Sequence, residues 1–183
     1  MNQLVTASAD QLAARRNTGG GDTHQYLTFN LGGEMFAVGI LNVKEIIEYG
    51  NLTEIPMMPA FIRGVINLRG AVVPVVDLSA RFSGQTSTVQ RRTCIVIVEV
   101  EQDEAKHDIG IMVDAVSEVL EIQASEIEPP PAFGAKIRAD FIAGMGKVTG
   151  KFVIILEIQK VLSVDEMALL SDMSQGSSEV PHH

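Results

Sequence analysis

The stretch F-I-R-G-V-I-N-L-R-G-A-V-V-P-V-V-D-L (residues 61–78) aligns without gaps on F-I-A-G-M-G-K-V-T-G-K-F-V-I-I-L-E-I (residues 141–158). Both stretches are runs of β-branched and apolar residues bounded by glycines, a pattern typical of β-strands and turns. Self-similarity at this scale is the mark of a repeated supersecondary unit. The sequence therefore predicts a fold built from two copies of one β unit.

Matches upstream extend the repeat in the same order. V-K-E-I-I (residues 43–47) echoes V-S-E-V-L (residues 116–120), so the copies cover residues 25–82 and 93–161. A unit this small has little core of its own, and we expect the two to pack together. Because closure removes exposed strand edges, we predict an all-β fold of two pseudo-symmetric barrels, each of about five strands.

The segments outside the two copies are predicted from their composition: a flexible tail (residues 1–24), a linker (83–92), a short C-terminal helix (162–173) and a second flexible tail (174–183). The segment 40–47 is ambiguous. Its apolar residues have helical spacing, but its β-branched flanks suit a strand–turn–strand equally well.

Composition argues against several classes of partner and location. The 183 residues carry a formal net charge of −9 and only pairs of adjacent basic residues, whereas nucleic-acid binding requires clustered Lys and Arg. A single cysteine, Cys94, permits no internal disulfide and fits a reducing compartment. The apolar runs are far shorter than the about twenty residues of a membrane helix, and the N-terminus lacks the apolar run of a signal peptide. We expect a cytoplasmic protein with no nucleic-acid partner and no direct membrane insertion.

The sequence offers no constellation that suggests catalysis. A catalytic triad or a metal site requires His or Cys close to carboxylates. His24 borders the N-terminal tail, and His107 lies in an acidic, loop-like stretch. No phosphate-binding or dinucleotide loop follows a strand. We expect no enzyme activity, metal or cofactor; a hydrolase or phosphate-binding enzyme is the alternative from another class.

The repeat separates residues that the fold requires from residues that are free to serve function. Features present in both copies are interpreted as structural: Gly64 with Gly144, Gly70 with Gly150, and Asp77 with Glu157. Arg69, by contrast, aligns with Thr149. The barrel does not require an arginine there, so Arg69 is a candidate contact residue, with an ordinary solvated turn charge as the competing interpretation.

Phe133 is the second asymmetric residue. It follows P-P-P-A on a loop that no strand pattern includes. An aromatic side chain on a proline-stiffened loop loses little entropy on docking, which suits an interface anchor. Packing of the ring back onto the body of the protein is the alternative.

Three runs resemble the pattern of the CheW family: Y-L-T-F-N-L-G-G-E-M-F-A-V-G-I-L-N-V-K-E-I (26–46), P-A-F-I-R-G-V-I-N-L-R-G-A-V-V-P-V-V-D-L (59–78) and I-G-I-M-V-D-A-V-S-E-V-L (109–120). The closing D-E-M-A-L-L (165–170) resembles it too. The match covers nearly the whole chain between the tails, and N-L-R-G followed by V-x-P-V-x-D-L is its specific part. The resemblance implies two Src-homology-3-like barrels related by pseudo-symmetry, in agreement with the repeat.

The resemblance also implies an adaptor. Proteins of this family couple methyl-accepting chemoreceptors to the histidine kinase CheA, binding the regulatory domain of the kinase and the cytoplasmic tip of the receptors. By motif position, the receptor side would use a groove between the barrels lined by Ile40, Val43, Glu45, Arg69, Cys94, Val116 and Val119. The kinase side would use the outer ends of the barrels: Gly64, Leu68, Gly70 and Phe133.

Further implications of the resemblance are a protein that is monomeric when isolated and that is recruited to membrane-associated receptor arrays. The alternative within the same class is a CheW-like adaptor of another receptor–kinase pathway, such as one for motility or development.

Overall fold

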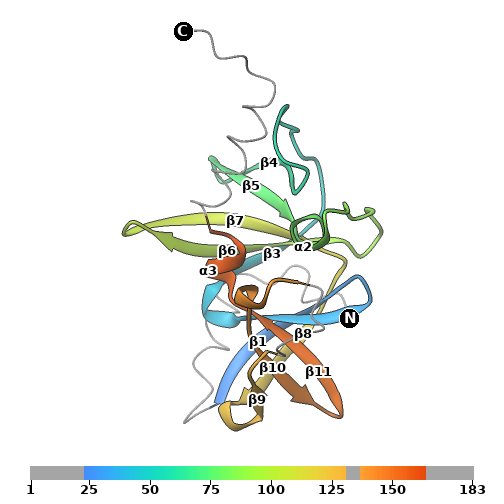
Figure 1. The fold of residues 1–183 in the computed structure, drawn as a ribbon. Helices are drawn as coiled ribbons and strands as arrows, with labels where there is room; N and C mark the ends of the chain where they lie inside the picture. Colours follow the sequence, from blue (N-terminus) through green and yellow to red (C-terminus); the bar gives the residue numbers. More distant parts are fainter. Residues whose placement is uncertain (1–22, 131–136, 164–183) are drawn as a thin grey trace, which may run out of the picture.

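The computed structural model describes residues 23–130 and 137–163. Its strands form two sheets, the upper and lower parts of the ribbon in Figure 1. No helix in these two ranges is long and apolar enough to cross a membrane. The strands are β1 (Thr23–Leu31), β2 (Glu34–Gly39), β3 (Val43–Glu48), β4 (Ile62–Leu68), β5 (Ala71–Asp77), β6 (Cys94–Gln102), β7 (Ala105–Val113), β8 (Ala115–Gln123), β9 (Ile127–Glu128), β10 (Ile142–Val148) and β11 (Lys151–Leu156).

The two sheets have the same topology. Sheet A has the strand order β8-β1-β2-β11-β10-β9, and sheet B has the order β3-β6-β7-β5-β4. The sequence repeat equates β1 with β6, β2 with β7, β3 with β8, β4 with β10 and β5 with β11, and this substitution converts one order into the other. The parallel pair β2–β11 likewise corresponds to the parallel pair β7–β5. The predicted all-β fold and its internal repeat are confirmed.

Each sheet contains strands from both copies of the repeat. The predicted domain boundaries, residues 25–82 and 93–161, follow the copies along the sequence and stay a prediction. Sheet A takes β1 and β2 from the first copy, and sheet B takes β6 and β7 from the second. The first hairpin of each copy therefore crosses into the sheet of the other. In this arrangement each hairpin lies between two further strands, so both of its edges are hydrogen-bonded.

Sheet B has the predicted five strands, whereas sheet A has a sixth, the two-residue strand β9. At the corresponding edge of sheet B there is only an isolated bridge between Thr53 and Val65. The ambiguous segment 40–47 is a single 3-10 turn, η2 (Ile40–Asn42), followed by β3, so the strand–turn–strand alternative is correct.

Two short helices were not predicted. They are α2 (Leu78–Ser83) and α3 (Ile158–Val161), which follow the equivalent strands β5 and β11; α3 lies between the two sheets in Figure 1. The helix predicted over residues 162–173 lies outside the described residues from position 164 onward, and Leu162 and Ser163 follow the end of α3.

The four two-residue hairpin turns within residues 23–130 and 137–163 have similar φ angles. Both central residues have positive φ: 60° and 84° at Gly32 and Gly33, and 54° and 63° at Asp103 and Glu104. The turns at residues 69–70 and 149–150 repeat this pattern with 54° and 85°, and 46° and 79°. Two positive φ angles are typical of a type I′ turn, whose twist matches that of the flanking strands. Gly70 and Gly150 thus serve the turn, as the repeat predicts.

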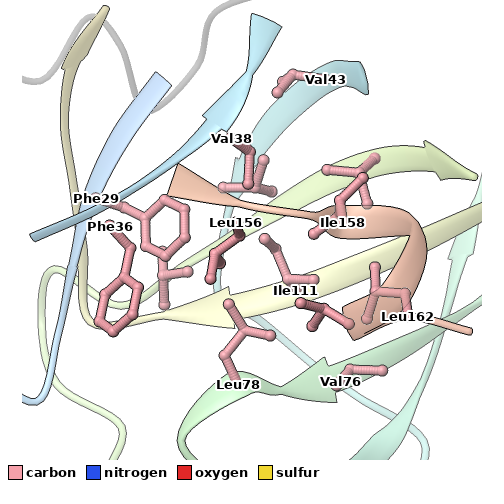
Figure 2. Packing of buried hydrophobic residues seen from close by; sticks show 14 of the residues in the cluster. Phe29, Phe36, Val38, Val43, Val76, Leu78, Ile111, Leu156, Ile158 and Leu162 are labelled. Carbon is pink, nitrogen blue, oxygen red and sulfur yellow. The ribbon is translucent and has the colours of Figure 1, made fainter. Parts of the chain in front are cut away.

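The core has three parts. Along β6, Ile95 and Ile97 join a cluster drawn from sheet B alone, whereas Val96 and Val98 face a larger cluster shared by both sheets. A third cluster belongs to sheet A alone. Figure 2 shows the shared cluster, in which Phe29 and Leu156 of sheet A and Ile111 and Val76 of sheet B belong to one packed group. One face of each sheet therefore packs against a cluster formed by that sheet alone, and the opposite face packs against the other sheet.

The carboxylate of Asp77 is fully buried and organises the end of the first copy. It accepts hydrogen bonds from the backbone N–H of Ala80 (3.3 Å) and from the backbone N–H and hydroxyl of Ser87 (2.7 and 2.8 Å). Arg63 Nη1 lies 3.5 Å from it. The structural role predicted for Asp77 is confirmed. Glu157 lies at the equivalent position before α3, but its side chain forms no helix-cap hydrogen bond.

Candidate protein-binding surfaces

An ion pair connects the β4–β5 turn of sheet B to strand β3 of the same sheet. Arg69, in the turn between β4 and β5, donates from Nη2 to Oε1 of Glu45 on β3 at 2.5 Å. The Arg69 side chain is 73% exposed, whereas that of Glu45 is 9% exposed. Because β3 and β4 are the two edges of sheet B, this pair joins the edges of a curved sheet. The hydrogen bond and the charge of Glu45 raise the pKa of Arg69 above its ordinary value, so Arg69 stays charged.

Arg69 is therefore more than a solvated turn charge. It is the counter-ion of a nearly buried carboxylate, and removing one partner of such a pair leaves the other uncompensated. The equivalent turn of sheet A carries Thr149, and Glu118, aligned with Glu45, is exposed. A threonine cannot form this ion pair, so the asymmetry seen in the sequence is also an asymmetry of charge pairing.

The apolar residues predicted to line a groove lie in the core between the sheets. Ile40, Val43, Cys94 and Val116 are each at most 7% exposed, and Val119 is half-buried against the same cluster. The structure brings these side chains together, but as packed core rather than as the lining of an open groove. Their part in receptor binding stays a prediction.

The thiol of Cys94 illustrates this burial. Its Sγ lies 3.2 Å from the carbonyl oxygen of Arg92, and burial raises its pKa above the ordinary value. A raised pKa keeps the thiol neutral near pH 7, and a neutral thiol is a poor nucleophile.

Two residues predicted for the kinase side have structural positions. A Cβ added at Gly64, whose φ is 153°, would lie 2.5 Å from the carbonyl oxygen of Thr53, so the glycine permits the close approach of two chain segments. Leu68 is half-buried against the cluster of sheet B. Gly64 and Leu68 therefore both have structural positions on β4.

The part of Gly64, Leu68, Gly70 and Phe133 in kinase binding stays a prediction. Gly70 is exposed and directly follows Arg69, so a predicted kinase position and a predicted receptor position share one turn. Phe133 lies outside the described residues.

One surface feature was missed by the sequence analysis. Phe152 on β11 is 52% exposed and borders a pocket of about 430 Å³, whose lining combines apolar side chains with polar and charged ones: Asn30, Gly33, Glu34, Met35, Met145, Lys151, Phe152 and Ile154. Its repeat counterpart Val72 is 68% exposed. In the repeat alignment Phe152 stands opposite the smaller side chain of Val72, which was an indication of a difference. The run 152–156 has the pattern of an apolar strand, and this pattern does not indicate that Phe152 is exposed.

Leu41 is a second exposed apolar residue that was missed. It lies in the 3-10 turn η2 and is 72% exposed, while its neighbour Ile40 is buried. The apolar spacing of residues 40–47 does not distinguish the exposed Leu41 from its buried neighbours.

Among residues 23–130 and 137–163, no three or more His, Cys, Asp or Glu side chains group together in a way that could hold a metal ion. His24 and His107 lie exposed on β1 and β7.

Comparison with known proteins agrees with this architecture. The family model described as "CheW-like domain" matches residues 25–166. The chemotaxis protein CheW of Klebsiella aerogenes is 36% identical over 152 residues, covering 83% of this chain and 89% of the relative. The CheW protein of Rhizobium meliloti is 33% identical, covering 84% and 96%. The crystal structure of the scaffolding protein TtCheW from Thermoanaerobacter tengcongensis superposes with a TM-score of 0.69 at 33% identity, covering 79% of this chain and 91% of that one. With the family model matching more than half of its length, the chain belongs to the CheW family.

Proposed function

We propose that this protein is a chemotaxis adaptor that couples methyl-accepting chemoreceptors to the histidine kinase CheA in the cytoplasm. Membership of the CheW family supports this function. The observation that carries it is a pseudo-symmetric scaffold with equivalent hairpin ends that differ chemically, Arg69 on one and Phe152 next to the other. Two dissimilar ends let one small protein make two different, heterologous contacts.

The kinase side is proposed to include the pocket beside Phe152. An exposed aromatic ring next to a pocket with two methionines and a charged rim is typical of an interface hot spot. Methionine side chains adapt to the shape of a partner, and the rim charges of Glu34 and Lys151 add orientation.

The receptor side is proposed to include the Arg69–Glu45 pair at the edge of sheet B. The guanidinium is largely exposed although one of its donors is engaged by Glu45, so other donors remain to meet a carboxylate or carbonyl of the receptor hairpin. The core residues behind it, among them Val43, hold β3 in place. Helical hairpins dock on other proteins through an apolar ridge flanked by polar contacts.

The adaptor is proposed to have no catalytic activity of its own. The only cysteine is buried with a raised pKa, and the features assigned above all serve packing or contact. Coupling then depends on weak, micromolar contacts that become strong when several act together in an array.

The test is isothermal titration of the purified chain against the isolated CheA regulatory domain and, separately, against a soluble receptor hairpin. We expect binding to both with dissociation constants of about micromolar size. Binding of both partners at once in a ternary titration distinguishes an adaptor from a competitor. If the chain failed to bind the kinase domain, or failed to bind the receptor hairpin, the proposed adaptor function would be contradicted.

A further inference from the structure

Sulfur side chains are the groups that hydrogen peroxide oxidises most readily, and the protein has one cysteine and eight methionines. Cys94 is 2% exposed, and burial raises the pKa of its thiol, which keeps the thiol in its unreactive neutral form. Met112 is fully buried in the cluster of sheet B. Reaction with peroxide therefore falls to the methionines that solvent reaches.

Two methionines border the pocket beside Phe152. Met35 on β2 and Met145 on β10 both line it, and both are half-buried. Met145 pairs with Ile154 of β11, and Phe152 lies two residues before Ile154, so these three side chains share one face of sheet A. The pocket of about 430 Å³ has room for a peroxide molecule, since a water molecule occupies only about 30 Å³ in the liquid.

The equivalent positions in sheet B carry no sulfur. The repeat aligns Met145 with Val65, and the parallel strand pairs of the two sheets equate Met35 with Asp108. Aliphatic and carboxylate side chains do not react with peroxide under conditions that oxidise a thioether. Oxidation therefore changes the pocket of sheet A and leaves the corresponding surface of sheet B as it is.

We propose that Met145, together with Met35, is a methionine oxidation site that weakens the kinase contact when it is oxidised. The thioether sulfur attacks one oxygen of hydrogen peroxide, and an S–O bond forms as the O–O bond breaks. The departing hydroxide takes the proton of the transferred oxygen and leaves as water. The sulfur loses two electrons, the peroxide gains them, and the product is a sulfoxide. The inference rests on the kinase contact proposed above.

The chemical change explains the loss of affinity. A thioether is apolar and adapts to the shape of a partner, whereas a sulfoxide is polar and chiral. A partner side chain that fills the pocket would bury the sulfoxide oxygen, and burial of a polar group without a hydrogen bond is unfavourable. We expect about tenfold weaker binding of the kinase regulatory domain. Because methionine sulfoxide reductases reverse the reaction, the change is a reversible one.

The test treats the purified full chain with hydrogen peroxide, removes the peroxide and titrates the chain with the kinase regulatory domain. Mass spectrometry should find an added oxygen atom on Met35 and Met145 but none on the buried Met112. In the Met35→Leu, Met145→Leu variant the treated and untreated affinities should be equal, although the remaining accessible methionines are still oxidised. Met57→Leu, which removes an exposed methionine outside the pocket, is the control and should show the same tenfold loss as the parent chain.

Reduction of the oxidised parent chain by methionine sulfoxide reductases should restore its affinity, and this measurement does not depend on the folding of a variant. Unchanged affinity after oxidation, an equal loss in the double variant, or unmodified Met145 when Met57 is fully oxidised would overturn this inference and leave the proposed function standing. If the untreated chain does not bind the regulatory domain at all, the proposed function and this inference are both overturned.

Discussion

The turns at Arg69–Gly70 and Thr149–Gly150 are two versions of one hairpin end. Their backbones are nearly the same, with φ angles of 54° and 85° in the first and 46° and 79° in the second. Their side chains differ: Arg69 neutralises Glu45, while the second turn carries a threonine that cannot. The strand pairing sets the backbone and leaves the exposed side chains free to diverge. A duplicated scaffold can in this way present two chemically different ends.

The strongest test of the shared backbone is at Gly64 and Gly144, which lie at equivalent β-bulges, where the register of β4 with β5 and of β10 with β11 shifts. Gly64→Ala should destabilise the protein by about 3 kcal/mol, because the new Cβ meets a backbone oxygen at 2.5 Å in a left-handed conformation. Gly144→Ala should cost less, about 1–2 kcal/mol, since its 2.5 Å contact is with the side-chain methyl of Ile127. Gly70→Ala, which meets nothing within 4 Å, is the control at about 1 kcal/mol. Urea unfolding measures all three, and equal costs at 64 and 144 would contradict the difference.

A second comparison sets Asp77 against Glu157. Asp77→Ala should cost about 2–3 kcal/mol, because it removes a helix cap and leaves the half-buried donors of Ser87 without their acceptor. Glu157→Ala should change the free energy of unfolding by less than about 0.5 kcal/mol, since its side chain makes no cap bond. The two variants are compared by urea unfolding. A similar loss of stability in both variants would mean that an acidic residue matters at this position whether or not its side chain forms these hydrogen bonds.

Phe152 and Val72 are the exposed residues at equivalent positions after the two turns, and they extend the comparison to partner binding. Phe152→Ser should weaken association with the kinase regulatory domain about tenfold or more, as truncation of an aromatic anchor usually does. Val72→Ser, at the equivalent exposed position, should leave that affinity nearly unchanged. Titration calorimetry gives both values, and a melt of each variant shows whether the fold is intact. Equal effects of the two changes would remove the pocket from the kinase side.

The smallest expected effect is at the β6–β7 turn. Glu104 has a φ of 63°, a conformation that costs an ordinary residue about 1–2 kcal/mol. Glu104→Gly should therefore stabilise the protein by about 0.5 kcal/mol after the entropy of glycine is counted. Gly33→Glu, the same position in the β1–β2 turn, should destabilise it by a similar amount. Thermal melts of the two variants should shift in opposite directions, and a shift in the same direction would contradict this.

Much of the fold could be predicted because the repeat preserves the residues that determine it. Gly70 and Gly150 recur because both turns require positive φ, and the apolar runs recur because both sheets bury them. The exchange of hairpins between the copies could not be predicted. Alternation along β1 or β6 indicates which side chains are buried, but it is the same whichever copy supplies the neighbouring strand.

The candidate site was predictable only in part for a related reason. Arg69 was found because it breaks the repeat, but its partner Glu45 is 24 residues away on the opposite edge of the sheet. The family resemblance assigned Val43 and Val116 to the receptor side by motif position, without indicating that both side chains lie in the core between the sheets. Phe152 was missed because an exposed aromatic residue within an apolar strand has the same pattern as a buried one.

The most direct test of a symmetric scaffold with asymmetric contacts is the pair Arg69→Glu and Thr149→Glu. Both place a glutamate at the same backbone position of equivalent turns. Calorimetric titration against the kinase regulatory domain and the receptor hairpin should show a ten- to hundredfold loss of affinity for at least one partner with Arg69→Glu, and no more than about a twofold change with Thr149→Glu. The charge-swapped variant Arg69→Glu, Glu45→Arg should recover the melting temperature lost by Arg69→Glu, because the ion pair is restored, but not the affinity. Equal losses from the two single changes, or unchanged affinity for both partners with Arg69→Glu, would contradict the proposed division of the molecule into a common scaffold and distinct contact ends.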